Sequence, residues 1–191
     1  MLKIKRIVKK VFFILLVLFS FLILDYNNLS LQGANATREF YTNNCSIESK
    51  QYVVTKIFDG DTILLGNGGK IRLLGIDAFE HDQNIYGIRG KDFLSMLLLS
   101  KNVCIETDVQ KNDVYGRILG YVFVHRSFIN EELLKNGYAI LYDFPPNIKY
   151  ISRLKKAQIY ARENMLGIWK RQNLILETPA QWRHKHPFKK K

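Results

Sequence analysis

Apolar and polar residues alternate through the middle of the chain in a way that predicts short β-strands. β-Branched and aromatic residues concentrate in five segments, and glycine-containing turns such as Asp59-Gly60 and Gly66–Gly69 bound the first three. These three segments follow one another through short turns, so we expect them to form an antiparallel meander. The five predicted strands cover residues 52–57, 62–65, 70–75, 103–107 and 117–125.

Three other segments have the spacing or the end signals of helices. Residues 88–101 place apolar residues at helical intervals. A shorter helix is expected at Asn130, a good N-cap residue, and it should stop before Gly137. A last helix should open at Asn147 or Ser152 and end near Gly167. The apolar side expected for the first helix consists of Ile88, Phe93, Met96, Leu97 and Ser100.

The order of these elements predicts the fold class. One helix follows the third strand and two follow the fifth, which suits a small closed sheet with helices packed on its outside. We therefore expect a mainly β, α+β fold: a five-stranded Greek-key barrel of the OB type with about three helices. The order of the strands within the sheet does not follow from the sequence alone.

The N-terminus has the composition of an export signal. Five of the first ten residues are basic, and Val11–Leu24 is a run of fourteen residues without a charge. This run is shorter than the roughly 20 residues that span a bilayer. Ala34-Asn35-Ala36 offers a small-x-small cleavage site. The alternative is an uncleaved anchor over residues 7–24, giving membrane attachment. Both interpretations place the rest of the chain outside the cytoplasm, as a secreted, periplasmic or outward-facing anchored protein.

Charge and composition divide the chain into four parts. Residues 1–36 form the signal peptide or membrane anchor, and residues 37–50 form a polar linker. Residues 51–170, the predicted folded domain, carry 16 Lys and Arg against 13 Asp and Glu, whereas residues 171–191 carry 6 against 1. This basic C-terminal tail suits an anionic partner such as nucleic acid or lipid, or it is simply solvated. Trp182 within it either stacks on bases or docks onto the barrel.

Two cysteines, Cys45 and Cys104, lack the close spacing of a zinc site. In an exported chain they suit a disulfide. The alternative is two unpaired thiols, with Cys104 as a small apolar residue on a strand. The sequence does not decide between them, because it does not fix the Cα separation that a disulfide requires.

Five charged residues suggest phosphoryl chemistry when they are considered together. Asp61, Asp77 and Glu80 offer the oxygen ligands that a hard divalent cation prefers. Arg72 and Arg117 offer planar cations that bind phosphate oxygens bidentately. Arg72 and Asp77 are separated by an odd offset, so on one extended strand they would face opposite sides. A bend is therefore needed between them, and Gly75 is suited to provide it.

The motifs that contain these residues resemble the staphylococcal-nuclease (thermonuclease) family. The resemblance extends over residues 52–169, and the order and spacing of its parts make it specific. The matching segments are Asp59-Gly60-Asp61-Thr62, Arg72–Glu80, Tyr86-Gly87, Tyr115-Gly116-Arg117, Asn130–Ala139 and Gly167-Ile168-Trp169.

This resemblance implies a fold, an activity and a set of residue roles. It implies an OB-fold barrel with three helices that hydrolyses DNA and RNA with the help of Ca²⁺. Low sequence specificity is expected, since nothing in the chain resembles a reader of base edges. We expect a monomer. The implied roles are calcium binding by Asp61, Asp77 and the backbone carbonyl of Ala78, catalysis by Glu80, Arg72 and Arg117, and nucleotide contact by Tyr115 and Tyr142.

Two positions depart from the family pattern. Ala78 stands where the type enzyme has threonine, and it keeps the backbone carbonyl that is needed. Phe79 stands where the family usually has proline, so the loop loses a fixed φ angle and should be looser. The alternative to an enzyme is a catalytically inactive OB-fold module, tethered at the membrane, that binds nucleic acid or protein.

Overall fold

The computed structural model describes residues 50–170 and 177–187. The predicted leader, the Ala34–Ala36 cleavage site, the polar linker and Cys45 lie outside the described residues. Cys104 lies buried on a strand and is disulfide-bonded. None of the helices in the described part of the chain is both long and apolar enough to cross a membrane.

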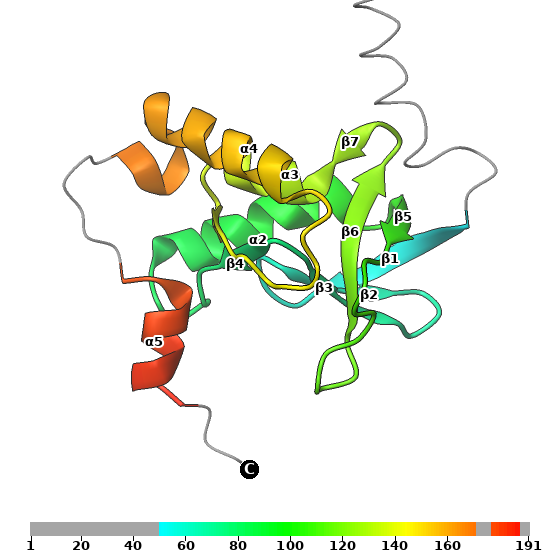
Figure 1. Cartoon of the computed structure of the whole chain (residues 1–191). Helices are drawn as coiled ribbons and strands as arrows, with labels where there is room; N and C mark the ends of the chain where they lie inside the picture. Colours follow the sequence, from blue (N-terminus) through cyan, green and yellow to red (C-terminus); the bar gives the residue numbers. More distant parts are fainter. Residues whose placement is uncertain (1–49, 171–176, 188–191) are drawn as a thin grey trace, which may run out of the picture. The chain divides into compact units, whose positions relative to one another are not determined.

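Five strands close into a barrel (Figure 1). Their order is β3-β2-β1-β5-β6, and a parallel pairing of β3 with β6 completes the ring, while the other neighbours run antiparallel. The predicted fold class, an α+β barrel of five strands, is confirmed in this form. The barrel strands are β1 (Gln51–Ile57), β2 (Thr62–Leu65), β3 (Lys70–Leu73), β5 (Asn102–Glu106) and β6 (Ile118–Val124).

Two smaller β-elements extend the barrel. β7 (Ser127–Phe128) pairs with the end of β6. β4 (Ile76–Ala78) and β8 (Ala139–Leu141) form a separate two-stranded sheet. The sequence pattern predicted one strand over residues 70–75, but the chain turns between β3 and β4. Gly75 adopts a φ of 75° there, so the predicted bend at Gly75 is confirmed.

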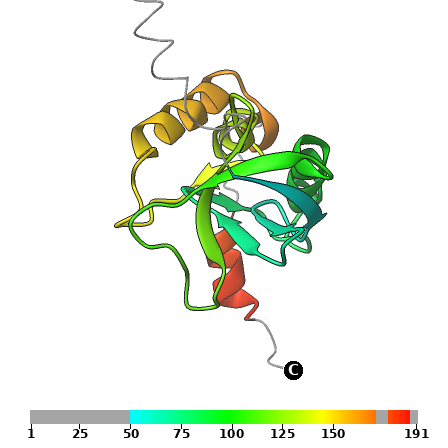
Figure 2. The ribbon, with the colours of Figure 1, turned by 90° about the vertical axis from the view of Figure 1, so that its right-hand side faces the viewer.

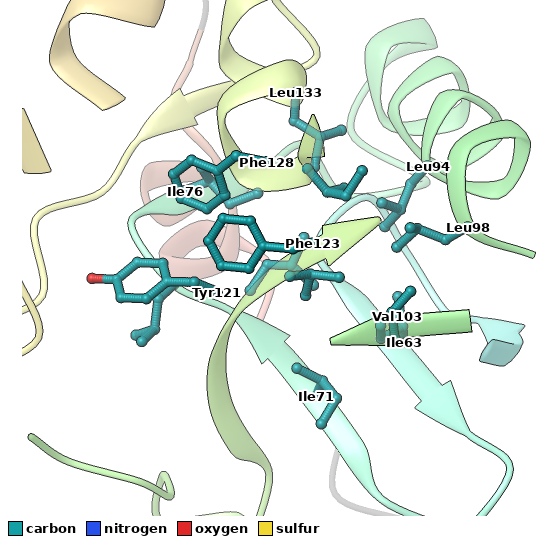
Figure 3. Close-up of a cluster of buried hydrophobic side chains, with 14 of the residues drawn as sticks. Ile63, Ile71, Ile76, Leu94, Leu98, Val103, Tyr121, Phe123, Phe128 and Leu133 are labelled. Atoms are coloured by element: carbon teal, nitrogen blue, oxygen red, sulfur yellow. The ribbon is translucent and has the colours of Figure 1, made fainter. Parts of the chain in front are cut away.

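Helices α3 and α4 pack against each other on one side of the barrel, as the two views in Figures 1 and 2 show. The aromatic part of the core lies beneath them: Phe123 and Phe128 stack with their centroids 4.7 Å apart, and Tyr121 meets Phe128 edge-on (Figure 3). These helices, with the short 3₁₀ turn that follows, are α3 (Ile129–Lys135), α4 (Ile151–Glu163) and η1 (Gly167–Lys170).

Helix α2 (Ile85–Leu98) faces the core with a side that differs from the predicted one. Its buried residues are Gly87, Gly90, Leu94 and Leu98, while Met96 of the expected apolar side is 65% exposed. The two glycines let the helix approach the chain closely, because a Cβ at Gly87 would lie 2.0 Å from the Glu80 carbonyl oxygen. The prediction is confirmed for Phe93 and Leu97, which pack against the core, and wrong for Ile88, Met96 and Ser100, which are exposed. Hydrophobicity does not register a contact that depends on the lack of a side chain, so the pattern missed Gly87 and Gly90.

Asn130 is not the N-cap that the sequence suggested. Helix α3 starts one residue before it, with Phe128 as the cap, and the Asn130 side chain is fully buried. Its Oδ1 accepts a hydrogen bond from the Val122 N–H at 2.9 Å, and its Nδ2 donates to the Leu74 carbonyl at 2.8 Å. Asn130 therefore joins α3 to β6 and to the end of β3.

The predicted basic tail contains a helix that the hydrophobic pattern did not predict, α5 (Pro179–Lys185). Thr178 and Gln181 form a capping box at its start, and Pro179 occupies the first turn. The ring of Trp182 stacks on His186, with centroids 4.5 Å apart. Arg183 of this helix bonds to Asp77 on β4 and to Glu80 on the loop after it.

We predict that Asn130→Ala lowers the free energy of unfolding by about 1–3 kcal/mol, because it leaves a buried N–H and a buried carbonyl without their side-chain partner. Urea unfolding with linear extrapolation measures this. Asn164→Ala is the control, since Asn164 is an exposed C-cap, and it should change stability by less than about 0.5 kcal/mol. Equal stability of the two variants would contradict the joining role of Asn130.

Candidate functional site

The turn before β2 carries two acidic side chains, and one of them, Asp61, bonds to β4. Asp61 is only 7% exposed; its Oδ2 accepts a hydrogen bond from the Ala78 N–H at 2.8 Å, and its Oδ1 accepts one from the Thr62 hydroxyl. Gly60 permits this approach, since a Cβ there would lie 2.7 Å from the Cβ of Ala78. Burial raises the pKa of Asp59 to about 7, and the negative charge of Asp61 adds to the shift.

Arg72 extends from β3 across the bend at Gly75. One of its terminal nitrogens donates to the carbonyls of Leu73 and Ile76, at 2.6 and 2.9 Å. The other lies 3.1 Å from Asp61 Oδ2 and 3.2 Å from Asp77 Oδ1. The guanidinium therefore connects three elements of the fold and brings two buried carboxylates into one cluster.

Asp77 and Glu80 follow on β4 and on the loop after it. Asp77 is 1% exposed, and burial raises its pKa above the ordinary value although Arg183 and Arg72 act in the opposite direction. The backbone N–H of Glu80 donates to the side chain of Gln83, which steadies the loop. Phe79, between these two acids, is buried against the ring of Tyr86.

Arg183 of α5 joins this cluster, although the sequence pattern assigned it no role. Its guanidinium binds both carboxylate oxygens of Asp77, at 3.2 and 2.9 Å, and Glu80 Oε1 at 2.9 Å. The only sequence signal for this helix is the capping-box pattern Thr178-Pro179-Ala180-Gln181. Arg183 thus completes one network of charged groups. The other members, all predicted from the sequence, are the guanidinium of Arg72 and the carboxylates of Asp61, Asp77 and Glu80.

Arg117 lies just before β6, and its Nε donates to Asp113 Oδ2 at 2.6 Å. Burial alone would raise the pKa of Asp113, but the hydrogen bonds from Arg117 and from the Tyr115 N–H bring it below the ordinary value. Among the described residues, no hydrogen bond or ion pair joins Arg117 directly to the carboxylate cluster. Arg117 still lies close to Arg72 along the fold, because it comes two residues before Leu119, the residue of β6 that pairs with Arg72.

The two predicted nucleotide-contacting tyrosines differ in their surroundings. Tyr115 is 82% exposed at the tip of the turn before β6, with the Arg117 guanidinium 5.6 Å from its ring centre. Tyr142 follows β8, and its backbone N–H donates to the Gly75 carbonyl at 3.1 Å. It therefore lies beside the bend that Arg72 spans.

The donor chemistry of the cluster suits a hard cation. Asp61 and Asp77 offer buried carboxylate oxygens, the ligands that Ca²⁺ and Mg²⁺ prefer, and two guanidinium groups already balance the negative charge there. Within the described ranges, no three His, Cys, Asp or Glu side chains are arranged to hold a metal ion. A metal here would rely on two carboxylates, backbone carbonyl oxygen and water. The backbone N–H of Ala78 donates to Asp61, so the residue predicted to offer its carbonyl lies next to one of these carboxylates.

Comparison with known proteins gives consistent results. The model of the family described as "Staphylococcal nuclease homologue" matches residues 70–171. Thermonuclease of Staphylococcus intermedius is 32% identical over 151 residues, which cover 75% of this chain and 90% of the relative. Thermonuclease of Staphylococcus hyicus is 34% identical over 150 residues, covering 74% and 89%. A protein of Haemophilus influenzae named "Uncharacterized endonuclease" is 35% identical over 144 residues, covering 73% and 76%.

The matched segment holds Arg72, Asp77, Glu80 and Arg117, and Asp61 precedes it by nine residues. The residues that the sequence singled out for phosphoryl chemistry therefore lie within or next to the part of the chain that defines the match. This chain belongs to the family of staphylococcal nuclease homologues.

Proposed function

We propose that this protein is an exported, calcium-dependent nuclease that hydrolyses phosphodiester bonds of DNA and RNA with low sequence specificity. The observation that supports it most is the buried cluster in which Arg72 holds Asp61 and Asp77 together beside Glu80. Membership of the nuclease family and the thermonuclease names of two relatives point in the same direction. An inactive binding module would not need three acids to be kept together at a cost in desolvation.

Asp61, Asp77 and the backbone carbonyl of Ala78 would hold the calcium ion, with water completing the shell. Bound there, Ca²⁺ would act as a Lewis acid that neutralises charge on one phosphate oxygen. The loop at Phe79 lacks the proline that is usual in the family. Because Phe79 is buried, packing replaces the fixed φ angle in holding this loop.

Arg72 and Arg117 bind the remaining phosphate oxygens and strengthen their hydrogen bonds as negative charge builds up in the transition state. Arg72 is fixed in place by two backbone carbonyls, so it loses little freedom when a phosphate binds. Glu80 orients or deprotonates the attacking water. The exposed ring of Tyr115 offers a surface on which a base can stack, and Tyr142 borders the same site.

The remaining parts of the chain receive roles in the same proposal. Residues 51–170 form the nuclease domain, and residues 1–36 act as a signal peptide or as an anchor through residues 7–24. Either leader places a monomeric enzyme outside the cytoplasm, where DNA and RNA are its substrates. The basic excess of residues 171–191 favours anionic partners.

Removal of calcium tests the proposal directly. The full chain, purified in mild detergent, should cleave both single-stranded DNA and RNA in the presence of Ca²⁺. Excess EGTA should abolish cleavage, and added Ca²⁺ should restore it, because chelation removes the proposed Lewis acid that neutralises charge on the phosphate. Binding of DNA without any cleavage at saturating Ca²⁺ would instead favour the inactive binding module.

Arg117→Ala should lower kcat by at least about 100-fold, since it removes a donor aimed at the charge of the transition state. The barrel should remain folded, because Arg117 lies in a turn and no core residue depends on it. Arg126→Ala removes an exposed arginine from the next turn and serves as the control, with unchanged kcat expected. Full activity of Arg117→Ala would remove Arg117 from the mechanism.

Asp113→Asn should lower kcat by roughly three- to tenfold, because the neutral amide holds Arg117 less firmly than the carboxylate does. The same substitution made in Arg117→Ala should have no further effect on kcat. A double-mutant cycle measures this dependence. Additive losses would mean that Asp113 acts by some route other than the position of Arg117.

A further inference from the structure

Helix α5 contacts the candidate site through two independent sets of bonds. The first set is formed by Arg183 with Asp77 and Glu80. The second runs through Gln83, whose Nε2 donates to the Glu177 carbonyl at 2.7 Å and whose Oε1 accepts from the Glu80 N–H at 3.2 Å. Gln83 therefore links Glu177, two residues before α5, to the loop that carries Glu80.

Helix α5 also has the internal bonds of a defined element. Thr178 and Gln181 bond to each other's backbone N–H at 3.2 and 2.9 Å, and Lys185 pairs with Glu177 at 2.7 Å. This helix presents Arg183 in a fixed direction, so the contact with Asp77 does not depend on a freely moving tail side chain.

Arg183 occupies the groups on which the proposed reaction depends. Its two terminal nitrogens take both oxygens of Asp77, the proposed calcium ligand, and one of them also takes Glu80, the proposed base. Ca²⁺ binds carboxylate oxygens at about 2.3–2.6 Å. Arg72 contacts one oxygen of Asp77 and leaves the other available, whereas Arg183 takes both oxygens. Arg183 and Ca²⁺ therefore compete for Asp77, and their like charges oppose simultaneous binding.

The charges of the site lead to the same conclusion. Asp61, Asp77 and Glu80 carry three negative charges when ionised, and Arg72 balances one of them. Either Arg183 or Ca²⁺ can supply further positive charge. If both were absent, two negative charges would remain in a largely buried site, which is costly. Burial alone would lower the pKa of Arg183, but the bonds to Asp77 and Glu80 outweigh burial, and the pKa is raised above its ordinary value. Arg183 therefore remains a cation at any working pH.

We propose that Arg183 is an autoinhibitory latch: docked on Asp77 and Glu80, it replaces the calcium ion, and calcium binding releases it. The proposal rests on the proposed function, because it requires the calcium site at Asp61 and Asp77. In the latched state the base is engaged and the metal ligand is occupied, so the enzyme is inactive. Calcium shifts the population to the released state, in which Glu80 can meet water and substrate.

Calcium affinity measured by isothermal titration on the full chain in mild detergent tests the latch. Arg183→Ala should bind Ca²⁺ at least about fivefold more tightly than the wild type, because the competing latched population is removed. Hydrolysis of single-stranded DNA should need correspondingly less Ca²⁺, while kcat at saturating Ca²⁺ should stay the same. His184→Ala removes an exposed side chain from the same helix without touching Asp77 or Glu80, so it should match the wild type in both measurements.

Thermal unfolding provides a second readout that does not depend on activity. Without Ca²⁺, Arg183→Ala should melt at a lower temperature than the wild type, because its carboxylates lack their counter-ion. Saturating Ca²⁺ should reduce this difference, since the ion supplies the missing charge. A difference in melting temperature that Ca²⁺ leaves unchanged would overturn the latch.

Two further results would overturn the latch. The first applies if the wild type binds Ca²⁺ and cleaves DNA: Arg183→Ala then has the same calcium affinity as the wild type. The other is a fall in kcat at saturating Ca²⁺ with no change in calcium affinity, which would make Arg183 a ligand of the substrate phosphate. A wild type that neither binds Ca²⁺ nor cleaves DNA would reject the proposed function, and the latch with it.

Discussion

The site depends on the position of one guanidinium, that of Arg72, between two buried carboxylates. Without a cation between them, the buried carboxylates of Asp61 and Asp77 would repel each other. Arg72 supplies that cation, and it also bonds to two carbonyls on either side of the Gly75 bend. The same interaction therefore joins the turn before β2 to β3 and β4 and brings together the charged groups that they carry.

Arg72 alone cannot balance the charges of Asp61, Asp77 and Glu80. The net negative charge that is left requires another cation. An uncompensated charge within a protein is costly, so under the proposed function the site needs a substitute cation when Ca²⁺ is absent. Arg183 supplies it from a helix more than a hundred residues along the chain. In the proposed latch, metal binding, the accessibility of Glu80 and the docking of α5 are linked because they depend on the same carboxylates.

Glycine and asparagine residues set the close approaches on which this geometry depends. Gly60 and Gly87 allow backbone segments to come within distances that any side chain would prevent, and they bring Asp61 to β4 and α2 to the Glu80 loop. Asn130 satisfies backbone groups where β3 leaves the barrel. Sequence patterns predicted the strands, the α3 segment and the Gly75 bend well, because each has a local signal in alternation or turn chemistry. They failed on part of the buried face of α2 and on the role of Asn130, where the deciding contact lies far away in the chain.

The sequence by itself determined the β-rich barrel, the family, and the set of acids and arginines, because strand alternation, turn residues and motif spacing are local properties. Only the tertiary structure decided which of these charged groups meet. It joined Asp61, Arg72, Asp77 and Glu80, placed Arg117 on Asp113, and brought Arg183 into the centre. The physical reason is that an ion pair depends on distance in space. The separation of its partners along the chain, 106 residues for Arg183 and Asp77, leaves no local trace.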